Sequence, residues 1–510
     1  MTHALDPHAS VLVVGAGVMG AGIAQLAARY GHSVFLFDTQ PDASARAIET
    51  IQTDLTRLVE RGKFSTTECA ALVERLHPVE TLAEAREVGI VMEAIVENLD
   101  AKCALLAQVE KIVSPECLIT TNTSSISINA IARALSAPER LVGMHFFNPV
   151  RIMKLVEVIS GLKTEAAIAS AVYETAKAWG KTAVHARSTP GFIVNRIARP
   201  FYAEALNLLQ DRFTSAEQID ACIRAAGFRM GPCELMDLIG QDVNFAVTQS
   251  VFAENFFDKR YTPSVIQKEL VDGGLLGRKS GYGFYPYPAE KESTPSKTEN
   301  DSLAAIRALG QLTLHGDDAT AQFIANRLTQ IGADFARDPA SLITQICAHD
   351  FDLRLTDGRP ASDIAAGQNI SNVAVFDWIA TEREPSVVAW ARSVQSDALF
   401  EKKVEGLLGA LGFTPIQAQD YPGLIVARTI SMIVNEANDA VNQGVCSEDD
   451  ADSAMRLGAN YPAGPFDWQN QWGALNIKNV LSALNDFYRG ERYRISPALQ
   501  HAVWRDTSDH

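Results

Sequence analysis

A strand, a glycine-rich loop and a helix near the N-terminus constrain the fold of this chain more than any other feature. Residues 11–14 (VLVV) are a short β-branched run that predicts a buried parallel strand. The run ends in GAGVMG at residues 15–20, and a helix with one apolar side follows. Residues 33–37 predict a second strand, which ends in Asp38. This order predicts a βαβ unit that binds a dinucleotide.

Each glycine of this loop has its own task in the predicted unit. Gly15 makes the tight turn, Gly17 lets backbone N–H groups approach a pyrophosphate, and Gly20 lets the helix pack closely on the strand. Val18 and Met19 complete the predicted loop contacts to the cofactor at the helix N-terminus.

The second strand bears on which cofactor binds. Asp38 stands at its end, where a carboxylate accepts hydrogen bonds from the ribose hydroxyls of NAD and repels the 2′-phosphate of NADP. Enzymes that use FAD share this layout, so the motif alone leaves NAD and FAD open.

Length, charge and cysteine content narrow the class of protein. The 510 residues exceed one compact core and suggest about three domains. A net charge of -16 argues against general binding to nucleic acid or to an anionic membrane. Seven scattered cysteines without a CxxC pair argue against a disulfide framework and against a zinc site. With no signal-type or membrane-spanning apolar run, we expect a soluble, cytoplasmic protein without a metal.

Further apolar runs predict more strands after the first βαβ unit. They lie at residues 88–96, 117–121, 141–147 and 154–159, and polar groups collect where several of them end. Residues 42–86 have helical spacing instead and carry the cations Arg57, Arg61 and Lys63. This cluster is either a solvated helix face or a site for the phosphates of a bulky anionic substrate.

Four polar side chains provide what a dehydrogenase needs above a nicotinamide ring. His145, at a strand end, is the candidate base for an alcohol proton. Glu157, inside the next apolar strand, is costly to bury unless it pairs with such a histidine. Ser124 and Asn195 could fix the substrate oxygen, although an asparagine at a helix start is often only a cap.

The chain also contains an internal repeat. The segment 180–196 matches 412–428, and Pro190 in the first segment corresponds to Pro422 in the second. The match continues from Glu204 to Glu436 and, after one inserted residue, reaches a second Gly-Pro. Two matching helical domains therefore follow two α/β pieces, and the second α/β piece has no GxGxxG, so we expect it to bind no nucleotide.

The predicted fold class is an α/β Rossmann-type dinucleotide-binding domain plus an all-α helical domain, followed by a degenerate α/β piece and a second copy of the helical domain. The expected boundaries are 8–188 for the nucleotide-binding domain, 189–287 for the helical domain, 288–302 for a linker, 303–411 for the degenerate piece and 412–510 for the second helical copy.

At this level of detail the chain resembles the NAD-dependent 3-hydroxyacyl-CoA dehydrogenases. The resemblance is carried by GAGVMGAGIAQLAA, EAIVENLDAK, TNTSSISI, GMHFFNPVRIMKLVEVI, STPGFIVNR and GRKSGYGFY, which span about residues 8–287. The whole layout resembles the long bacterial form associated with phenylacetate degradation, which implies 3-hydroxyadipyl-CoA as substrate.

The resemblance also implies roles for particular residues. It makes His145 the general base, Glu157 its paired acid, and Ser124 and Asn195 the groups that hold the substrate near C3 and the thioester. It implies a CoA tail along the helices after the second strand, near the basic cluster. The NAD contacts that it adds are Asp38, Glu97, Lys102, Asn122 and Asn148.

Several alternatives stay open at this stage. The substrate could be 3-hydroxybutyryl-CoA, another short-chain 3-hydroxyacyl-CoA or a free hydroxy acid. A non-catalytic NAD-binding protein would be expected to lack His145 or Glu157, and no hydratase-like domain is evident. A dicarboxylic substrate would need a distal cation, for which Arg196, Arg199 and Arg229 are candidates.

The second copy departs from the catalytic pattern. Ala427 stands where Asn195 stands in the first copy, and no HFFNP follows the strands of the second α/β piece. Short members of the family dimerise through the helical domain. We therefore expect either a homodimer or an intramolecular pseudo-dimer, in which the second helical copy packs on the first.

Overall fold

The computed structural model describes residues 4–288, 302–384 and 387–508. The chain divides into two compact units, Met1–Arg196 with Ala440–Ala459, and Ile197–Asp439 with Asn460–His510. Residues 289–301 of the predicted linker lie outside the described residues. This division into two units does not test the five segments expected from the sequence, so their boundaries stay a prediction.

The first unit is built on one sheet whose described strands follow the order β3-β2-β1-β4-β5-β6-β7-β8. Neighbouring strands are parallel except β6 and β7, which are antiparallel. Several of the strands are continuous apolar runs because helices cover the sheet, and all four residues of β1 are buried. The strands are β1 (Val11–Val14), β2 (Val34–Phe37), β3 (Leu76–Val79), β4 (Ile90–Glu93), β5 (Leu118–Thr121), β6 (Leu141–Phe146), β7 (Leu155–Ser160) and β8 (Thr182–Arg187). The helices are α1 (Val18–Arg29), α2 (Ala43–Glu60), α3 (Thr66–Glu74), α4 (Leu99–Glu110), α5 (Ile128–Ala132), α6 (Ala166–Ala178) and α7 (Val194–Ile197).

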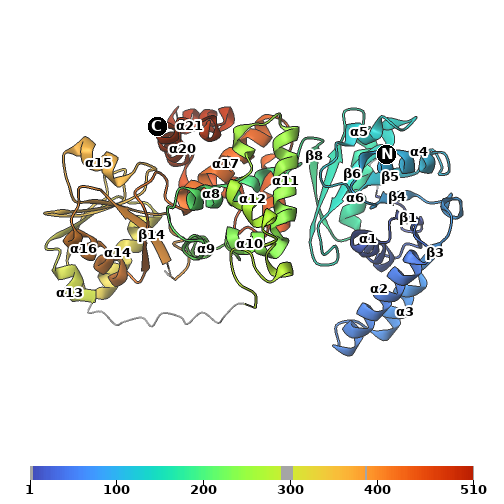
Figure 1. Ribbon diagram of the computed structural model, residues 1–510, viewed down its shortest axis with the longest axis horizontal. Coiled ribbons are helices and arrows are strands. Elements are labelled where there is room, and N and C mark those ends of the chain that lie inside the picture. Colours follow the sequence, from blue (N-terminus) through green and yellow to red (C-terminus); the bar gives the residue numbers. More distant parts are fainter. Residues whose placement is uncertain (1–3, 289–301, 385–386, 509–510) are drawn as a thin grey trace. The chain divides into compact units, whose positions relative to one another are not determined.

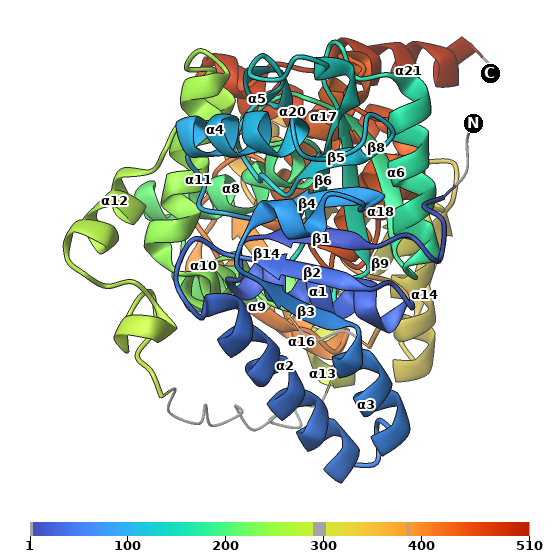
Figure 2. The same cartoon turned by 90° about the vertical axis from the view of Figure 1, so that its right-hand side faces the viewer.

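One prediction is wrong here, because residues 42–86 are not helical throughout. Helices α2 and α3 form a hairpin that extends beyond the edge of the sheet (Figure 2). Leu76–Val79, which follows the hairpin, forms strand β3 at the edge of the sheet beside β2. Pro78 is tolerated there because an edge strand leaves one row of its N–H groups without a ladder partner.

The second unit contains most of both helical copies. Equivalent helices begin at corresponding positions of the sequence repeat, and α9 and α18, for example, begin at Ala216 and Glu448. The first copy has α8 (Arg199–Gln210), α9 (Ala216–Ala225), α10 (Pro232–Ile239), α11 (Gln241–Glu254) and α12 (Val265–Asp272). The second copy has α17 (Val426–Asn442), α18 (Glu448–Gly458), α19 (Pro465–Trp472), α20 (Ala474–Tyr488) and α21 (Pro497–Ser508), of which α18 belongs to the first unit.

The second α/β piece forms its own sheet, with the described strands in the order β10-β9-β11-β12-β13-β14-β15. Helices α13 and α16 pack on each other, and Figure 1 shows them on the side of the sheet opposite α15. The strands are β9 (Leu312–His315), β10 (Phe335–Asp338), β11 (Gln345–Ala348), β12 (Phe351–Leu355), β13 (Val373–Phe376), β14 (Val387–Arg392) and β15 (Thr414–Gln417). The helices are α13 (Ser302–Arg307), α14 (Ala319–Ile331), α15 (Ala361–Gln368) and α16 (Ala398–Ala410). The predicted fold class is confirmed.

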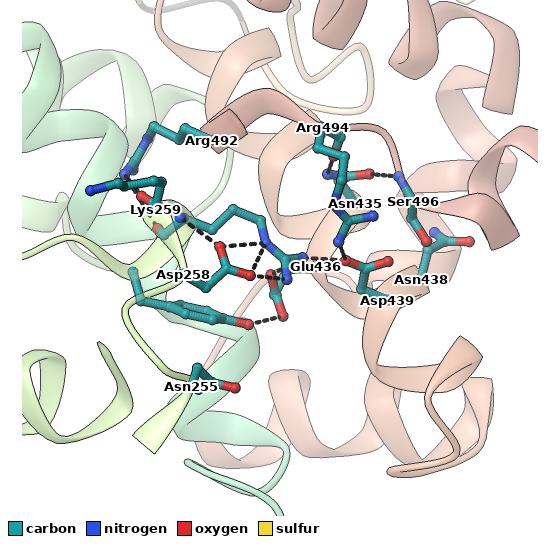
Figure 3. Close-up of polar contacts among 12 residues, drawn as sticks. Asn255, Asp258, Lys259, Asn435, Glu436, Asn438, Asp439, Arg492, Arg494 and Ser496 are labelled. Atoms are coloured by element: carbon teal, nitrogen blue, oxygen red, sulfur yellow. Dashed lines mark hydrogen bonds and ion pairs between the residues drawn. The ribbon is translucent and has the colours of Figure 1, made fainter. Parts of the chain in front are cut away.

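The two helical copies pack on each other through reciprocal buried ion pairs. Glu436 of the second copy accepts a hydrogen bond from Tyr261 at 2.5 Å and pairs with Arg260 at 3.2 Å. The same guanidinium pairs with Asp439 and Asp258, whose carboxylates lie on either side of Glu436 (Figure 3).

In the opposite direction, Glu204 of the first copy pairs with Arg492 at 2.9 Å and accepts a hydrogen bond from Tyr493 at 3.2 Å. Glu204, Arg492 and Tyr493 occupy the repeat positions of Glu436, Arg260 and Tyr261. The contact therefore has the reciprocity of a two-fold interface.

Candidate active site

The glycine loop leaves room for a ligand at the N-terminus of α1. A Cβ atom built on Gly17 would meet no heavy atom within 4 Å, and this N-cap position has no side-chain cap. A Cβ atom on Gly20 would lie 1.7 Å from the carbonyl oxygen of Gly15, so only glycine fits there. The N–H groups at the start of α1 therefore face a space into which a phosphate can move.

Asp38 lies at the end of β2 beside this loop. One carboxylate oxygen accepts the N–H of Ala16 at 2.7 Å, and the other accepts the N–H of Gln40 at 2.9 Å. The side chain is half-buried, which is the setting expected for a group that also meets the ribose hydroxyls of NAD.

At the corresponding position in the second sheet an acidic side chain caps the helix. Gly316 follows β9, and Asp318 is the N-cap of α14. Its carboxylate accepts the N–H of Ala321 at 2.8 Å and the hydroxyl of Thr344 at 2.6 Å. A fixed carboxylate at the helix N-terminus repels a phosphate, which agrees with the expectation that this piece binds no nucleotide.

His145 and Glu157 form a buried pair in the first sheet. They are direct neighbours in the register of β6 and β7, so their side chains lie on the same face. Nδ1 of His145 lies 2.7 Å from a carboxylate oxygen of Glu157, and the two side chains are 7% and 1% exposed. Strand β7 is antiparallel to β6. Glu157 therefore lies beside His145 from within β7, whereas His145 lies near the end of β6.

The other oxygen of Glu157 is held by the backbone just before and at the start of α7. It accepts the backbone N–H groups of Ile193 and Val194, both at 3.0 Å. Asn195 follows directly in α7, so the residue predicted to hold the substrate is fixed by the same carboxylate that orients His145. Phe192 completes this arrangement, with its ring 6.0 Å from the imidazole.

Ser124 lies in a turn that Glu97 organises. One oxygen of Glu97 accepts the N–H and the hydroxyl of Ser124, at 2.8 Å and 3.2 Å, and the hydroxyl of Thr123 at 2.7 Å. Burial works to raise the pKa of Glu97, but Lys102 and the hydrogen bonds from this turn outweigh it and lower the pKa to about 2. Glu97 is therefore a carboxylate under all ordinary conditions, and it fixes the turn that carries Ser124.

Lys102 is buried beneath this turn, and only 1% of its side chain is exposed. Its ammonium group lies 2.7 Å from Glu93 and 3.3 Å from Glu97. The structure thus shows Lys102 as the counter-ion of Glu97, and a direct contact with NAD stays a prediction. Glu93 was not predicted, although an acidic residue at the end of the apolar run IVME was a signal for a buried ion pair.

Asn122 and Asn148 flank the strand that carries His145. The side-chain oxygen of Asn122 accepts the N–H of Phe146 at 2.8 Å, which ties the turn after β5 to the end of β6. Asn148 is exposed just beyond β6. Their contacts with a cofactor stay predictions.

Comparison with known proteins identifies the family. Residues 10–189 match the 3-hydroxyacyl-CoA dehydrogenase NAD binding domain, and residues 191–287 and 423–507 match the 3-hydroxyacyl-CoA dehydrogenase C-terminal domain. Residues 353–422 match the 3-hydroxybutyryl-CoA dehydrogenase reduced Rossmann-fold domain. The chain is 42% identical over 497 residues to the 3-hydroxyadipyl-CoA dehydrogenase of Escherichia coli K12, covering 95% of each chain. The chain belongs to the 3-hydroxyacyl-CoA dehydrogenase family.

Other members of the family show which parts are shared. A crystal structure titled 3-hydroxybutyryl-CoA dehydrogenase from Escherichia coli K12 has a TM-score of 0.88 and 40% identity, and the match covers 99% of this chain and all of that one. A probable 3-hydroxybutyryl-CoA dehydrogenase of Bacillus subtilis is 39% identical over 278 residues, which are 54% of this chain and 96% of the relative. The short relative thus corresponds to about half of this chain.

As a member of this family the chain is an NAD-dependent 3-hydroxyacyl-CoA dehydrogenase. The open N-terminus of α1 and the placement of Asp38 fit the cofactor. Among the described residues, no group of three His, Cys, Asp or Glu side chains could hold a metal ion. No helix in the part of the chain that the structure describes is long and apolar enough to cross a membrane.

A cavity of about 220 Å³ lies among α1, α2 and α3. Its apolar wall is formed by leucines and Phe64, and the cations Arg29, Lys63 and Arg151 line it as well. Of the basic cluster predicted from the sequence, only Lys63 lines this cavity. Arg57 lies outside it and pairs with Asp54 at 3.2 Å on an exposed helix face, and Arg61 is the exposed C-cap residue of α2.

Proposed function

We propose that the chain oxidises the C3 hydroxyl of a (3S)-3-hydroxyacyl-CoA to the 3-oxoacyl-CoA and that its substrate is 3-hydroxyadipyl-CoA. The His145–Glu157 pair carries this proposal, with 2.7 Å between imidazole and carboxylate in the sheet that also bears the glycine loop. A buried imidazole held by a carboxylate can take up the proton of an alcohol.

The residues of this chain have separate tasks in the proposed reaction. NAD+ accepts the hydride from C3 when it is bound. Nε2 of His145 takes the hydroxyl proton, and the carboxylate of Glu157 stabilises the imidazolium that results. Ser124 and Asn195 hold the substrate through its C3 oxygen and thioester, each from a backbone that Glu97 or Glu157 fixes. The products are the 3-oxoacyl-CoA, NADH and a proton.

The choice of substrate rests on the full-length relative. The relative named 3-hydroxyadipyl-CoA dehydrogenase matches 95% of this chain, including the second copy. The full-length solved structure is titled a 3-hydroxybutyryl-CoA dehydrogenase, so 3-hydroxybutyryl-CoA is the second candidate. Only the dicarboxylic substrate needs a cation at the distal end of the acyl group.

The three candidate cations named from the sequence differ in exposure. Arg196 and Arg199 are only 2% and 5% exposed, and Arg199 already packs on the ring of Tyr202 and donates to Thr248. Arg229 is exposed. We assign the CoA phosphates to the cavity lined by Arg29, Lys63 and Arg151, whose apolar wall can receive an adenine ring.

The test compares kcat/KM for 3-hydroxyadipyl-CoA, 3-hydroxybutyryl-CoA and 3-hydroxyhexanoyl-CoA. We expect the highest value for 3-hydroxyadipyl-CoA. A wild-type preference for 3-hydroxybutyryl-CoA would contradict the substrate assignment, and turnover of free hydroxy acids at similar efficiency would contradict the CoA requirement.

A further inference from the structure

Part of the second helical copy belongs to the unit that carries the catalytic pair. Residues Ala440–Ala459, which include α18, group with the nucleotide-binding sheet. Helix α18 packs against β7 and β8, and the N–H of Arg187 at the end of β8 donates to the carbonyl of Val445 at 2.8 Å. The second copy has no catalytic pair of its own, but these contacts connect it to the sheet that carries His145 and Glu157.

Helix α18 approaches the catalytic region closely at Gly458, its last residue. A Cβ atom there would lie 2.6 Å from Cδ2 of Leu155 and 2.9 Å from Cγ2 of Val194. Both side chains are buried, at 0% and 6% exposure. Leu155 can move the far end of its side chain away from a new Cβ atom. Val194 is β-branched and cannot adjust in this way. Any side chain at position 458 must therefore displace the backbone of Val194 or of α18.

Displacement of Val194 would act on the catalytic pair. Its N–H group is one of the two that hold Glu157, and Leu155 precedes Glu157 in the same strand. The loop before α18 carries Cys446, and burial and the negative charges of Asp450 and Glu157 raise the pKa of its thiol to about 12. The second copy therefore covers the place where Glu157 receives its hydrogen bonds.

We propose that Gly458 is a positioning residue for the oxidation step. Its missing side chain lets α18 close on β7 and α7, which keeps the N–H of Val194 on Glu157 and thereby keeps His145 in place. This inference rests on the proposed function, since it assigns the second copy a task in the same proton transfer. The second half of the chain is then part of the active site's framework, although it binds neither substrate nor cofactor.

The internal repeat supplies a matched control position. Ala226, directly after α9, is the repeat counterpart of Gly458, and α9 packs on β14 as α18 packs on β7. Ala226 lines a small cavity together with Asp377 and Ala389. In the second sheet these two residues occupy the register positions that His145 and Glu157 have in the first, so no proton transfer depends on this contact.

The experiment measures Gly458→Val, Gly458→Ala and Ala226→Val in the full-length chain. We expect Gly458→Val to lower kcat by about 10- to 100-fold while KM for NAD+ stays as in the wild type, because about 1 Å of misplacement at a catalytic group has that effect. Gly458→Ala should fall between the two. Ala226→Val should keep the wild-type kcat.

A rescue experiment separates positioning from general damage. Adding Val194→Ala to Gly458→Val removes the clash but keeps the N–H of residue 194, so kcat should recover at least tenfold. Wild-type kcat in both Gly458 variants, an equal loss in Ala226→Val or the absence of rescue would overturn the proposal. If Gly458→Val does not fold, Gly458→Ala with and without Val194→Ala decides the question by the same criteria.

The readout is the ratio of variant to wild-type kcat, measured with 3-hydroxyadipyl-CoA and with 3-hydroxybutyryl-CoA. If the substrate assignment is wrong, kcat with 3-hydroxyadipyl-CoA is low in the variant and in the wild type alike, and the ratio of the two values is unchanged. A wrong role for Gly458 brings the ratio to one with either substrate.

Discussion

Single carboxylates decide the geometry of this active site more than its polar ligand-binding groups do. Glu157 holds an imidazole with one oxygen and two backbone N–H groups with the other. Glu97 holds the turn that carries Ser124 in the same way. Each of these acids converts a flexible contact into a fixed one, because a charged acceptor makes stronger hydrogen bonds than a neutral one.

Glu97→Gln should lower kcat about tenfold, because a neutral amide holds the Ser124 turn less firmly.

Glu97→Gln should also lower the melting temperature at pH 7. The pKa of Glu97 is lowered from 4.5 to about 2, so its contribution to stability is fully present above pH 4.5 and is lost as the pH falls toward 2. Thermal unfolding at pH 7 and pH 3.5 tests this, since the gap between variant and wild type must shrink at the lower pH. An equal gap at both values would speak against it.

Lys63→Glu should raise KM for the acyl-CoA at least tenfold with little change in kcat, because the contact binds substrate and transition state equally. Steady-state kinetics over a range of acyl-CoA concentrations measure both constants. Arg57→Glu is the matched control, since Arg57 is on the same hairpin but outside the cavity, and its KM should stay near the wild-type value. Equal effects of the two substitutions would indicate a general effect of charge and would remove the cavity from the CoA site.

At the scale of elements, the two sheets show how one architecture gains or loses a cofactor. The N-terminus of α1 is uncapped and open at Gly17, whereas the side chain of Asp318 caps α14. The same comparison holds for the catalytic strands, because the positions of His145 and Glu157 are taken by Asp377 and Ala389. The carboxylate of Asp377 accepts the N–H groups of Ile425, Val426 and Ala427, so a structural contact stands where the first sheet has the proposed catalytic pair.

This difference between the sheets predicts one bound NAD per chain. Calorimetric titration with NADH should give a stoichiometry near one, and Gly17→Val should abolish binding without unfolding the chain. Valine at position 17 has space in the free protein but fills the approach to the helix N-terminus. A stoichiometry near two, or a single site that survives in Gly17→Val, would place a nucleotide on the second sheet.

Most elements of the first sheet could be predicted from the sequence because buried parallel strands are continuous apolar runs. The glycine loop, Asp38, His145 and Glu157 were predicted for the same reason, since each lies in or beside such a run. Strand β3 could not be predicted, because LHPV has an apolar residue only at each end and its position comes from pairing with β2. The ion pair of Lys102 with Glu93 was also missed, because the acidic residue at the end of IVME signals a buried pair but the local sequence does not show its partner.

On the scale of the whole molecule, the repeat explains why one chain carries two helical copies. The sets around Glu204 and Glu436 are reciprocal, as in a two-fold dimer. Opposing arginines lower the pKa of buried Glu204 against the effect of burial, so this carboxylate is charged and depends on the other copy. The sequence predicted that the two helical copies pack on each other. A repeat does not show against which sheet each helix packs, so the packing of α18 on β7 was not predicted.

A chain cut after residue 288 should therefore not remain a fully active monomer. It loses the second-copy partners of Glu204 and Arg260, and exposure of these charges and of the surrounding apolar surface should drive it to dimerise or to aggregate. Light scattering and activity measurements on the fragment test this. A soluble, monomeric and fully active fragment would remove the reason for the second copy.

The central claim is that His145, held by Glu157, is the base that makes bound NAD+ an oxidant. The most direct test measures kcat and NADH binding in His145→Gln beside His185→Gln, a control on β8 of the same sheet whose ring stacks on Tyr173. We expect His145→Gln to lower kcat by about 10²- to 10⁴-fold with NADH affinity unchanged, while His185→Gln keeps nearly full activity. Turnover near the wild-type rate in His145→Gln would contradict the claim.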